Sequence, residues 1–421
     1  MPDPVQTVES VEEILGRARR LREQALRSDL SPLQVIEILE RWGDALRGPT
    51  VDSIPGVPFL RLWLRRGTLE PVVVRELGTE GLRAQWRAEH GIRLRTFPLG
   101  VVGHWPAGNI EIQPMLSLTC ALLGGNGSLV RIPSGLVAQS RAIIEKLCDV
   151  DTGGVLTERI FLVAFDHERA DLQRAMASAV DGAMIWGGDE AVTQIRSLPF
   201  PNWARIAVFG PRLSVAAMDE ESWREPQGRH IWCQRIARDV WQFDQQACSS
   251  PQTLFLEQGA DADVADFVTT LAEAFRTENR LHPRVTIHPA TTSAICLSRA
   301  SWLLQDVGHS AVFPASPDWT ILVGKSSDLP APTQGRTLSV LIVESLLDAI
   351  VKFDGTVQTL GLAIADGDKE VGLTQAAGRS GVDRIVKLGR MHVFGSPWDG
   401  TDMIRPMVRL VRHVPSADMR S

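Results

Sequence analysis

Residues 97–134 read FPLGVVGHWPAGNIEIQPMLSLTCALLGGNGSLVRIPS, and the order of patterns in this stretch decides the fold class. The apolar run LGVVGHW comes first, a helical pattern follows at 111–123, and a second apolar run, SLVRIP, comes near the end. Each run has the length of a buried strand, and a connection that contains a whole helix joins parallel strands instead of closing a hairpin. The stretch therefore predicts a β-α-β unit.

The same alternation continues along the chain and predicts two α/β domains in series. The runs RIFLVAF, GAMIWG and RIAVFG start at residues 159, 182 and 205, and helical patterns at 136–148, 168–179 and 189–197 separate the successive runs. Strands about 25 residues apart with helices between them favour a parallel sheet. A second series begins after Cys248 and comprises TLFLEQG, WTILVG, LSVLIVES, TLGLAIAD and DRIVKLG.

Two amphipathic helices are predicted ahead of these domains, within residues 8–48. Ser10 and Glu13 have the spacing of a capping box at the start of the first helix. Ser31 and Pro32 give the second helix an N-cap followed by proline at its first position. The segment GPTVDSIPGVP at 48–58 is rich in turn-forming residues, so we expect a hinge there.

The composition is that of a soluble globular protein and excludes several functional classes. Of the 421 residues, 44 are Lys or Arg and 50 are Asp or Glu, so the net charge is −6. This mild acidity provides no bulk field that would attract nucleic acid or an anionic membrane. Residues 112–130 carry no charge, but polar side chains interrupt them, so we expect no membrane span.

Cysteine usage indicates a reducing compartment. The start of the chain has no apolar signal segment, and none of the five cysteines forms a C-x-x-C pair. We therefore expect free thiols, a cytoplasmic protein and no metal site. No G-x-G-x-x-G follows a predicted strand, and no H-E-x-x-H, kinase or G-x-S-x-G motif is present. The cysteines are Cys120, Cys148, Cys233, Cys248 and Cys296.

Three segments, in their order along the chain, resemble the aldehyde dehydrogenase superfamily and, within it, the long-chain acyl-CoA reductases of the LuxC type. They read PAGN at 106–109, GNGSLVRIPS at 125–134 and QQACSSP at 245–251. The stretches QTLGL at 358–362, WDG at 398–400 and RPMVRLV at 405–411 are also similar to that branch. The resemblance spans about residues 95–415, and QQAC is its most specific part.

The resemblance implies an aldehyde dehydrogenase-like α/β fold with a parallel-sheet cofactor domain and a thiol domain. We expect an N-terminal helical segment at 1–57, a dinucleotide-binding domain at 58–228 and a catalytic domain at 229–395. The remaining residues, 396–421, are expected to form a C-terminal strand and tail that favours a homo-oligomer.

The activity implied by the resemblance is the reduction of an acyl-CoA or acyl-protein thioester to an aldehyde. Cys248 is expected to attack the thioester carbonyl, because a thiolate is a strong nucleophile. NADPH is expected to supply the hydride, with NADH as the alternative. Asn109 is expected to stabilise the oxyanion. Its alternative role is to hold the Gly108-Asn109 turn in a left-handed conformation. His104, five residues upstream of Asn109, is expected to be structural.

Four residues are expected to bind the cofactor by resemblance. Arg131 lies where the family has a basic residue near the adenosine ribose, and Ser134 follows it in the same loop. A guanidinium suits a 2′-phosphate. Gly187 and Gly188 close a strand and open a helix whose N-terminus suits the pyrophosphate. Against that contact, Asp189 and Glu190 in the first turn repel phosphate, and Asp189 as a plain N-cap is the alternative.

The absence of a water-activating base favours reduction over oxidation of an aldehyde to an acid. Val208 stands where hydrolytic relatives in the superfamily carry a glutamate, although Glu111 or Glu225 remain alternatives. A catalytically silent scaffold for an acyl-activating partner is a further alternative, disfavoured by Cys248 and Asn109. An acyl-activating enzyme or a carrier protein is the expected partner.

Overall fold

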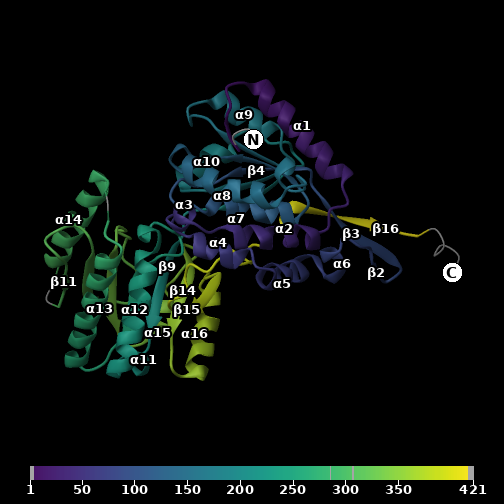
Figure 1. Cartoon of the computed structure of the whole chain (residues 1–421). Coiled ribbons are helices and arrows are strands. Elements are labelled where there is room, and N and C mark those ends of the chain that lie inside the picture. Colours follow the sequence, from purple (N-terminus) through teal and green to yellow (C-terminus); the bar gives the residue numbers. More distant parts are fainter. Residues whose placement is uncertain (1–3, 285, 306–307, 416–421) are drawn as a thin grey trace. The chain divides into compact units, whose positions relative to one another are not determined.

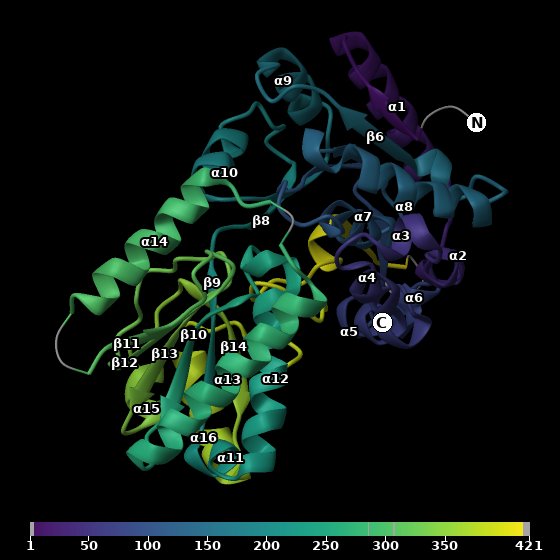
Figure 2. The same cartoon turned by 60° about the vertical axis from the view of Figure 1, so that its left-hand side comes forward.

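The structure, a computed structural model, describes residues 4–284, 286–305 and 308–415, and the chain divides into two compact units. Unit 1 comprises Met1–Gly210 and Phe394–Ser421, and unit 2 comprises Pro211–Val393. Each unit is built on a sheet of mainly parallel strands that carries helices, as the ribbons of Figures 1 and 2 show. The predicted α/β class with two α/β domains is confirmed.

The main sheet of unit 1 has six parallel strands in the order β1-β6-β5-β4-β7-β8. All five apolar runs predicted for this part of the chain form strands. The chain builds outward from β4 through β5 to β6, then returns to add β7 and β8 on the other side of β4, so the order reverses between β4 and β7. The strands are β1 (Val5–Thr7), β4 (Val101–Trp105), β5 (Gly127–Arg131), β6 (Ile160–Ala164), β7 (Gly182–Trp186) and β8 (Arg205–Phe209).

Helices cover this sheet and bury its apolar side chains. Residues of α1 (Val11–Arg27), α9 (Ala170–Ser178) and α10 (Asp189–Arg196) share one core cluster with the strands. Helices α2 (Pro32–Ala45), α7 (Gln113–Leu123) and α8 (Val137–Val150) pack together, and the indole of Trp42 donates to the carbonyl of Ile143 at 3.0 Å.

The N-terminal helices form with the predicted N-caps, Ser10 and Ser31, and only the capping box expected at Ser10 and Glu13 is incomplete. Ser10 accepts a hydrogen bond from the backbone of Glu13, whereas the reciprocal capping box occurs at α2, between Ser31 and Gln34. Within the expected turn-rich segment 48–58, prolines at first-turn positions start two short helices, and residues 53–56 between them form turns. The short helices of this region are α3 (Pro49–Asp52), α4 (Val57–Trp63), α5 (Arg66–Leu77) and α6 (Thr79–Leu82).

A three-stranded sheet in unit 1 joins the C-terminal strand to the rest of the unit. Its order is β16-β3-β2, with β2 (Arg87–Glu89), β3 (Ile92–Pro98) and β16 (Val408–His413) antiparallel. The buried carboxylate of Glu76 accepts the backbone N–H groups of Ile404 and Arg405, each at 2.8 Å. This contact fixes the segment that leads into β16.

The sheet of unit 2 has seven strands in the order β11-β12-β13-β10-β9-β14-β15, and every pairing except that of β11 with β12 is parallel. Strand β9 lies between β10 and β14, which is why unit 2 begins at Pro211 and not at the expected residue 229. The strands are β9 (Leu213–Met218), β10 (Pro251–Glu257), β11 (Ser310–Val312), β12 (Thr320–Lys325), β13 (Thr337–Val343), β14 (Val357–Ala363) and β15 (Arg384–Lys387).

Helices lie on both faces of the seven-stranded sheet (Figure 2). On one face α12 (Pro226–Trp241) and α13 (Asp261–Leu281) share a core cluster with the strands. On the other face α15 (Leu346–Ile350) and α16 (Gly367–Arg379) form a second cluster. The remaining helices are α11 (Glu220–Arg224) and α14 (Pro289–Leu303). Among the described residues, no helix combines the length and the apolar character needed to cross a bilayer.

Candidate active site

Cys248 lies on a turn before β10, at the amino-terminal edge of the seven-stranded sheet of unit 2. Its side chain is partly exposed. The hydroxyl of Ser214 on β9 donates to the carbonyl oxygen of Cys248 at 2.6 Å. The side-chain amide of Gln358 on β14 donates to the sulfur, with Nε2 and Sγ 3.4 Å apart. Two neighbouring strands therefore hold the thiol-bearing turn at the sheet edge.

The chain reaches this turn through three consecutive residues in the left-handed region. Phe243, Asp244 and Gln245 have φ angles of 55°, 54° and 61°. Each non-glycine residue in this region costs about 1–2 kcal/mol, so other contacts must hold the segment. The carboxylate of Asp244 pairs with the guanidinium groups of Arg336 at 2.6 Å and Arg284 at 3.0 Å.

Gln245 is the second anchor of the left-handed segment. Its buried amide donates to the carbonyls of Pro251 and Thr337, each at 2.8 Å, and accepts the N–H of Thr337 at 2.7 Å. The first glutamine of the QQAC motif therefore fastens the turn to β10 and β13. The sequence beside Cys248 contains no cation, and Arg284 and Arg336 could not be predicted, because they lie 40 and 92 positions from their partner Asp244 and form no local motif.

A buried histidine supports the turn from its other side. The Ser249 hydroxyl and Nδ1 of His392 are 2.9 Å apart, and Nε2 of His392 lies 2.7 Å from the carbonyl oxygen of Asp239. Since a carbonyl only accepts, Nε2 carries the proton and Nδ1 accepts from Ser249. Burial lowers the pKa of His392 to about 4, so the ring is neutral at pH 7. Burial also raises the pKa of Asp239 to about 7, against the lowering effect of the Gly389 N–H.

The other four cysteines have surroundings that differ from those of Cys248. Cys120 and Cys233 are buried, donate to helix carbonyls, and have pKa values raised by burial. Burial and nearby acidic groups raise the pKa of the Cys148 thiol. Cys296 is exposed on α14. In the part of the chain that the structure describes, no group of three or more His, Cys, Asp or Glu residues could hold a metal ion.

Asn109, the predicted oxyanion donor, and the predicted cofactor residues Arg131 and Gly187 lie at the carboxyl edge of the unit 1 sheet. Asn109 follows β4, Arg131 ends β5 and Gly187 follows β7. The order of the sheet reverses between β4 and β7, and in open α/β sheets a ligand typically binds at such a reversal, beyond the carboxyl ends of the strands. Asn109 is exposed on a turn, and neither it nor Gly108 has a positive φ, so the left-handed alternative is wrong.

Two features of this edge suit phosphate oxygens. The Arg131 guanidinium is half-buried 5.5 Å from the ring centroid of Phe165, and its buried Nε has no hydrogen-bond partner among the described residues. Burial lowers the pKa of Arg131, and nearby Asp166 opposes this shift. Gly188 is the N-cap of α10, and no side chain caps that helix, so Asp189 as the N-cap is wrong. Exposed N–H groups at a helix N-terminus bind anions. Ser134 is exposed and begins a short 3₁₀ segment.

The other residues considered as acids or bases, or as the position of a base, occupy different parts of the two units. His104 is buried on β4 with Nδ1 2.7 Å from the Ser117 hydroxyl, and burial lowers its pKa to about 3, so it is structural. Glu225 follows the carboxyl end of β9, whereas Cys248 precedes β10, so the two lie at opposite edges of one parallel sheet. Glu111 lies two residues after Asn109, and burial raises its pKa. Val208, on β8, packs against the unit 1 core.

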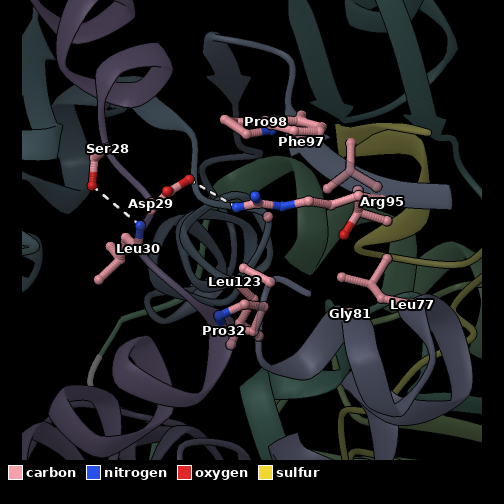
Figure 3. A pocket seen from close by; sticks show the side chains of 14 residues that line it. Ser28, Asp29, Leu30, Pro32, Leu77, Gly81, Arg95, Phe97, Pro98 and Leu123 are labelled. Carbon is pink, nitrogen blue, oxygen red and sulfur yellow. Dashed lines mark hydrogen bonds and ion pairs between the residues drawn. The ribbon is translucent and has the colours of Figure 1, made fainter. Parts of the chain in front are cut away.

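A small cavity in unit 1 lies away from this edge (Figure 3). Its walls include Pro98 and Gly124, which precede β4 and β5, so it opens at the amino-terminal edge of the sheet. The ion pair of Asp29 with Arg95, at 2.8 Å, crosses the cavity wall. The space inside is about 30 Å³, enough for about one water molecule and too small for an acyl chain.

The two α/β units have an aldehyde dehydrogenase-like fold. An oxidoreductase from Marinobacter aquaeolei aligns with a TM-score of 0.74 at 12% identity, over 96% of this chain and 90% of that protein. The NADP-dependent glyceraldehyde-3-phosphate dehydrogenase from Bacillus halodurans, complexed with NADP, aligns with a TM-score of 0.69 at 13% identity, over 96% and 92%. At these identities the likeness concerns the fold.

The family described as acyl-CoA reductase (LuxC) matches residues 8–412, and the chain belongs to it. A relative from Photobacterium leiognathi, named long-chain acyl-protein thioester reductase 2, is 22% identical over 352 residues, which make up 83% of this chain and 70% of the relative. The predicted family is confirmed, and the chain is an oxidoreductase that acts on thioesters.

Proposed function

We propose that the chain reduces an acyl-CoA or acyl-protein thioester to an aldehyde through an acyl group carried on Cys248. The observation that supports this most is the position of Cys248, partly exposed on an anchored turn with an amide donor 3.4 Å from its sulfur. Membership of the acyl-CoA reductase family supports the thioester as substrate. The name of the Photobacterium leiognathi relative supports an acyl-protein thioester among the substrates.

In the proposed mechanism the Cys248 thiolate attacks the thioester carbonyl, and the substrate thiolate leaves. A thiolate suits this step because thioester exchange replaces one carbon–sulfur bond by another. The contacts of Asp244 and Gln245 fix the turn before the substrate arrives, so no ordering of the turn is needed during the reaction. For Asn109 we propose the role of oxyanion donor, which suits an exposed side-chain amide at the end of β4.

When bound, a reduced nicotinamide nucleotide would supply the hydride, and the acyl-cysteine would give an aldehyde and the free Cys248 thiolate. The residues we propose to hold it are Arg131 and Ser134 on one side of the order reversal and Gly187 and Gly188 on the other. The unpartnered Nε of Arg131 favours NADPH, because a guanidinium can bind the 2′-phosphate with two hydrogen bonds.

The side chains considered as water-activating bases favour retention of the acyl group until reduction. Val208 can neither accept a proton nor orient a water molecule, and Glu225 lies at the edge of its sheet opposite Cys248. The carboxyl of Glu111 has a pKa raised by burial, which makes it a weaker candidate base at neutral pH than an exposed glutamate. We also propose that the chain acts in the cytoplasm as a homo-oligomer, with an acyl-activating enzyme or an acyl carrier protein as its partner.

The test is to incubate the chain with acyl-CoA and NADPH and to measure aldehyde, free CoA and the intact mass of the protein. We expect aldehyde and CoA in equal amounts, and without NADPH an acyl adduct on the protein. Cys248→Ala should remove the adduct and the aldehyde but not NADPH binding. Cys296→Ala, at the exposed cysteine of α14, is the matched control and should keep both. A full acyl adduct on Cys248→Ala would overturn the proposal.

A further inference from the structure

We propose that Gln358 is a further catalytic residue, whose side-chain amide stabilises the thiolate of Cys248 and is oriented for this by Thr359 and Arg384. The inference rests on the proposed function only in taking Cys248 as the nucleophile. It concerns how the sulfur is made reactive.

The backbone of β14 is irregular at Gln358. In the pairing of β14 with β9, Val357 lies opposite Leu213 and Thr359 lies opposite Ser214, so Gln358 is an extra residue without a partner. Such a bulge interrupts the alternation of a strand and redirects a side chain, and bulges often occur next to active sites. Here the redirected side chain is buried and reaches the sulfur of Cys248, with Nε2 and Sγ 3.4 Å apart.

Hydrogen bonds fix which end of the Gln358 amide faces the sulfur. The guanidinium of Arg384 donates to the Thr359 hydroxyl at 3.3 Å. The hydroxyl proton of Thr359 is then directed to Oε1 of Gln358, at 3.2 Å. Since Oε1 accepts from Thr359, Nε2 is the end that points to Cys248, and it can only donate.

A donor in this position favours the thiolate over the thiol. Hydrogen bonds to an ionised acceptor are stronger than those to a neutral one, and they are stronger still where burial excludes water. The guanidinium of Arg384 is held in place by the carbonyls of Met391 and Val393, at 2.6 and 2.7 Å, and adds a positive charge behind the amide.

The other charged groups around the turn do not replace this contribution. Asp244 is paired with Arg284 and Arg336, so its negative charge is compensated. His392 bonds to Ser249 and to a backbone carbonyl, and its lowered pKa leaves it neutral. Gln358 is thus a side chain that donates a hydrogen bond directly to the Cys248 sulfur.

The test measures alkylation of the full-length chain by iodoacetamide across pH 6–10, with the Cys248 peptide quantified by mass spectrometry. In Gln358→Met, which keeps the length but removes the donor, the apparent pKa of Cys248 should rise by about one unit, so alkylation at low pH slows about tenfold. Thr359→Val keeps Gln358 but loses its orienting hydroxyl, and the apparent pKa should rise by a smaller amount. The exposed Cys296 is an internal control, with an unchanged profile in both variants.

The outcomes separate this inference from the proposed function, because alkylation needs neither acyl substrate nor cofactor. If Gln358→Met leaves the Cys248 profile unchanged while Cys248→Ala abolishes aldehyde formation, Gln358 has no role at the sulfur although the proposed function stands. If Cys248→Ala still forms aldehyde, the proposed function fails, but the alkylation profile of Cys248 in Gln358→Met still tests the hydrogen bond between Gln358 and the sulfur. Should Gln358→Met fail to fold, an unchanged profile in Thr359→Val refutes the oriented amide.

Discussion

Replacing Gln245 by leucine tests whether the first glutamine of the QQAC motif anchors the thiol-bearing turn. Leucine fills most of the space of the side chain but cannot pair with the carbonyls of Pro251 and Thr337 or with the N–H of Thr337. All three contacts are buried, because Gln245 is fully inaccessible to solvent. The change therefore leaves three backbone groups without their partners.

The expected loss of stability follows from these contacts. Each buried, unsatisfied group costs about 1–3 kcal/mol, so three of them cost roughly 3–9 kcal/mol. Burial of the leucine side chain returns about 1.5–3 kcal/mol. We expect the free energy of unfolding to fall by about 4 kcal/mol, the difference between the midpoints of these two ranges.

Urea unfolding measures this loss, and hydrogen exchange at the Thr337 amide reports it locally. Protection of that amide should decrease strongly, because its acceptor is the side chain that has been replaced. Gln227→Leu, at an exposed position of α12, is the control, and its free energy of unfolding should change by less than about 0.5 kcal/mol. A loss below about 1 kcal/mol in Gln245→Leu, with the Thr337 amide still protected, would refute the anchoring argument.

Three further predictions concern cofactor, water and pH. Arg131→Ala should weaken NADPH binding by about 1–3 kcal/mol and NADH binding much less, as titration calorimetry would measure; equal losses would assign Arg131 to the shared part of the nucleotide or to the fold. With acyl-CoA but no NADPH, free CoA should appear in one burst equal to the active sites and then slowly, because Val208 provides no base; steady release at the turnover rate would contradict this. Asp239 has a raised pKa of about 7, so between about pH 4 and 7 its carboxyl is protonated in the folded state but ionised in the unfolded state. The free energy of unfolding therefore falls as the pH rises through this range. Asp239→Asn removes this titration. The difference in urea midpoint between the variant and the parent should therefore favour the variant more at pH 7.5 than at pH 5. An equal difference at both pH values would contradict the argument from the buried carboxyl.

The sequence by itself determined the fold class, the position of most strands and the family. The apolar runs at 99–105, 128–133 and 182–187 form adjacent strands. They could be predicted because a short run of apolar residues between helical patterns is typical of a buried strand. The QQAC segment predicts Cys248 as the nucleophile, and the resemblance predicts roles for Asn109, Arg131 and Gly187, which stay predictions.

Only the tertiary structure decided which strands share a sheet and what surrounds the thiol. The runs at 205–210 and 213–218 are almost continuous in sequence, yet β8 and β9 belong to different sheets, and periodicity carries no information about partners. Arg336 reaches Asp244 across 92 positions, and Gln358 reaches Cys248 across 110. These contacts arise because parallel strands that are distant in the chain begin at the same edge of the sheet. A thiol's local neighbours in sequence therefore cannot reveal the charges and donors that surround it.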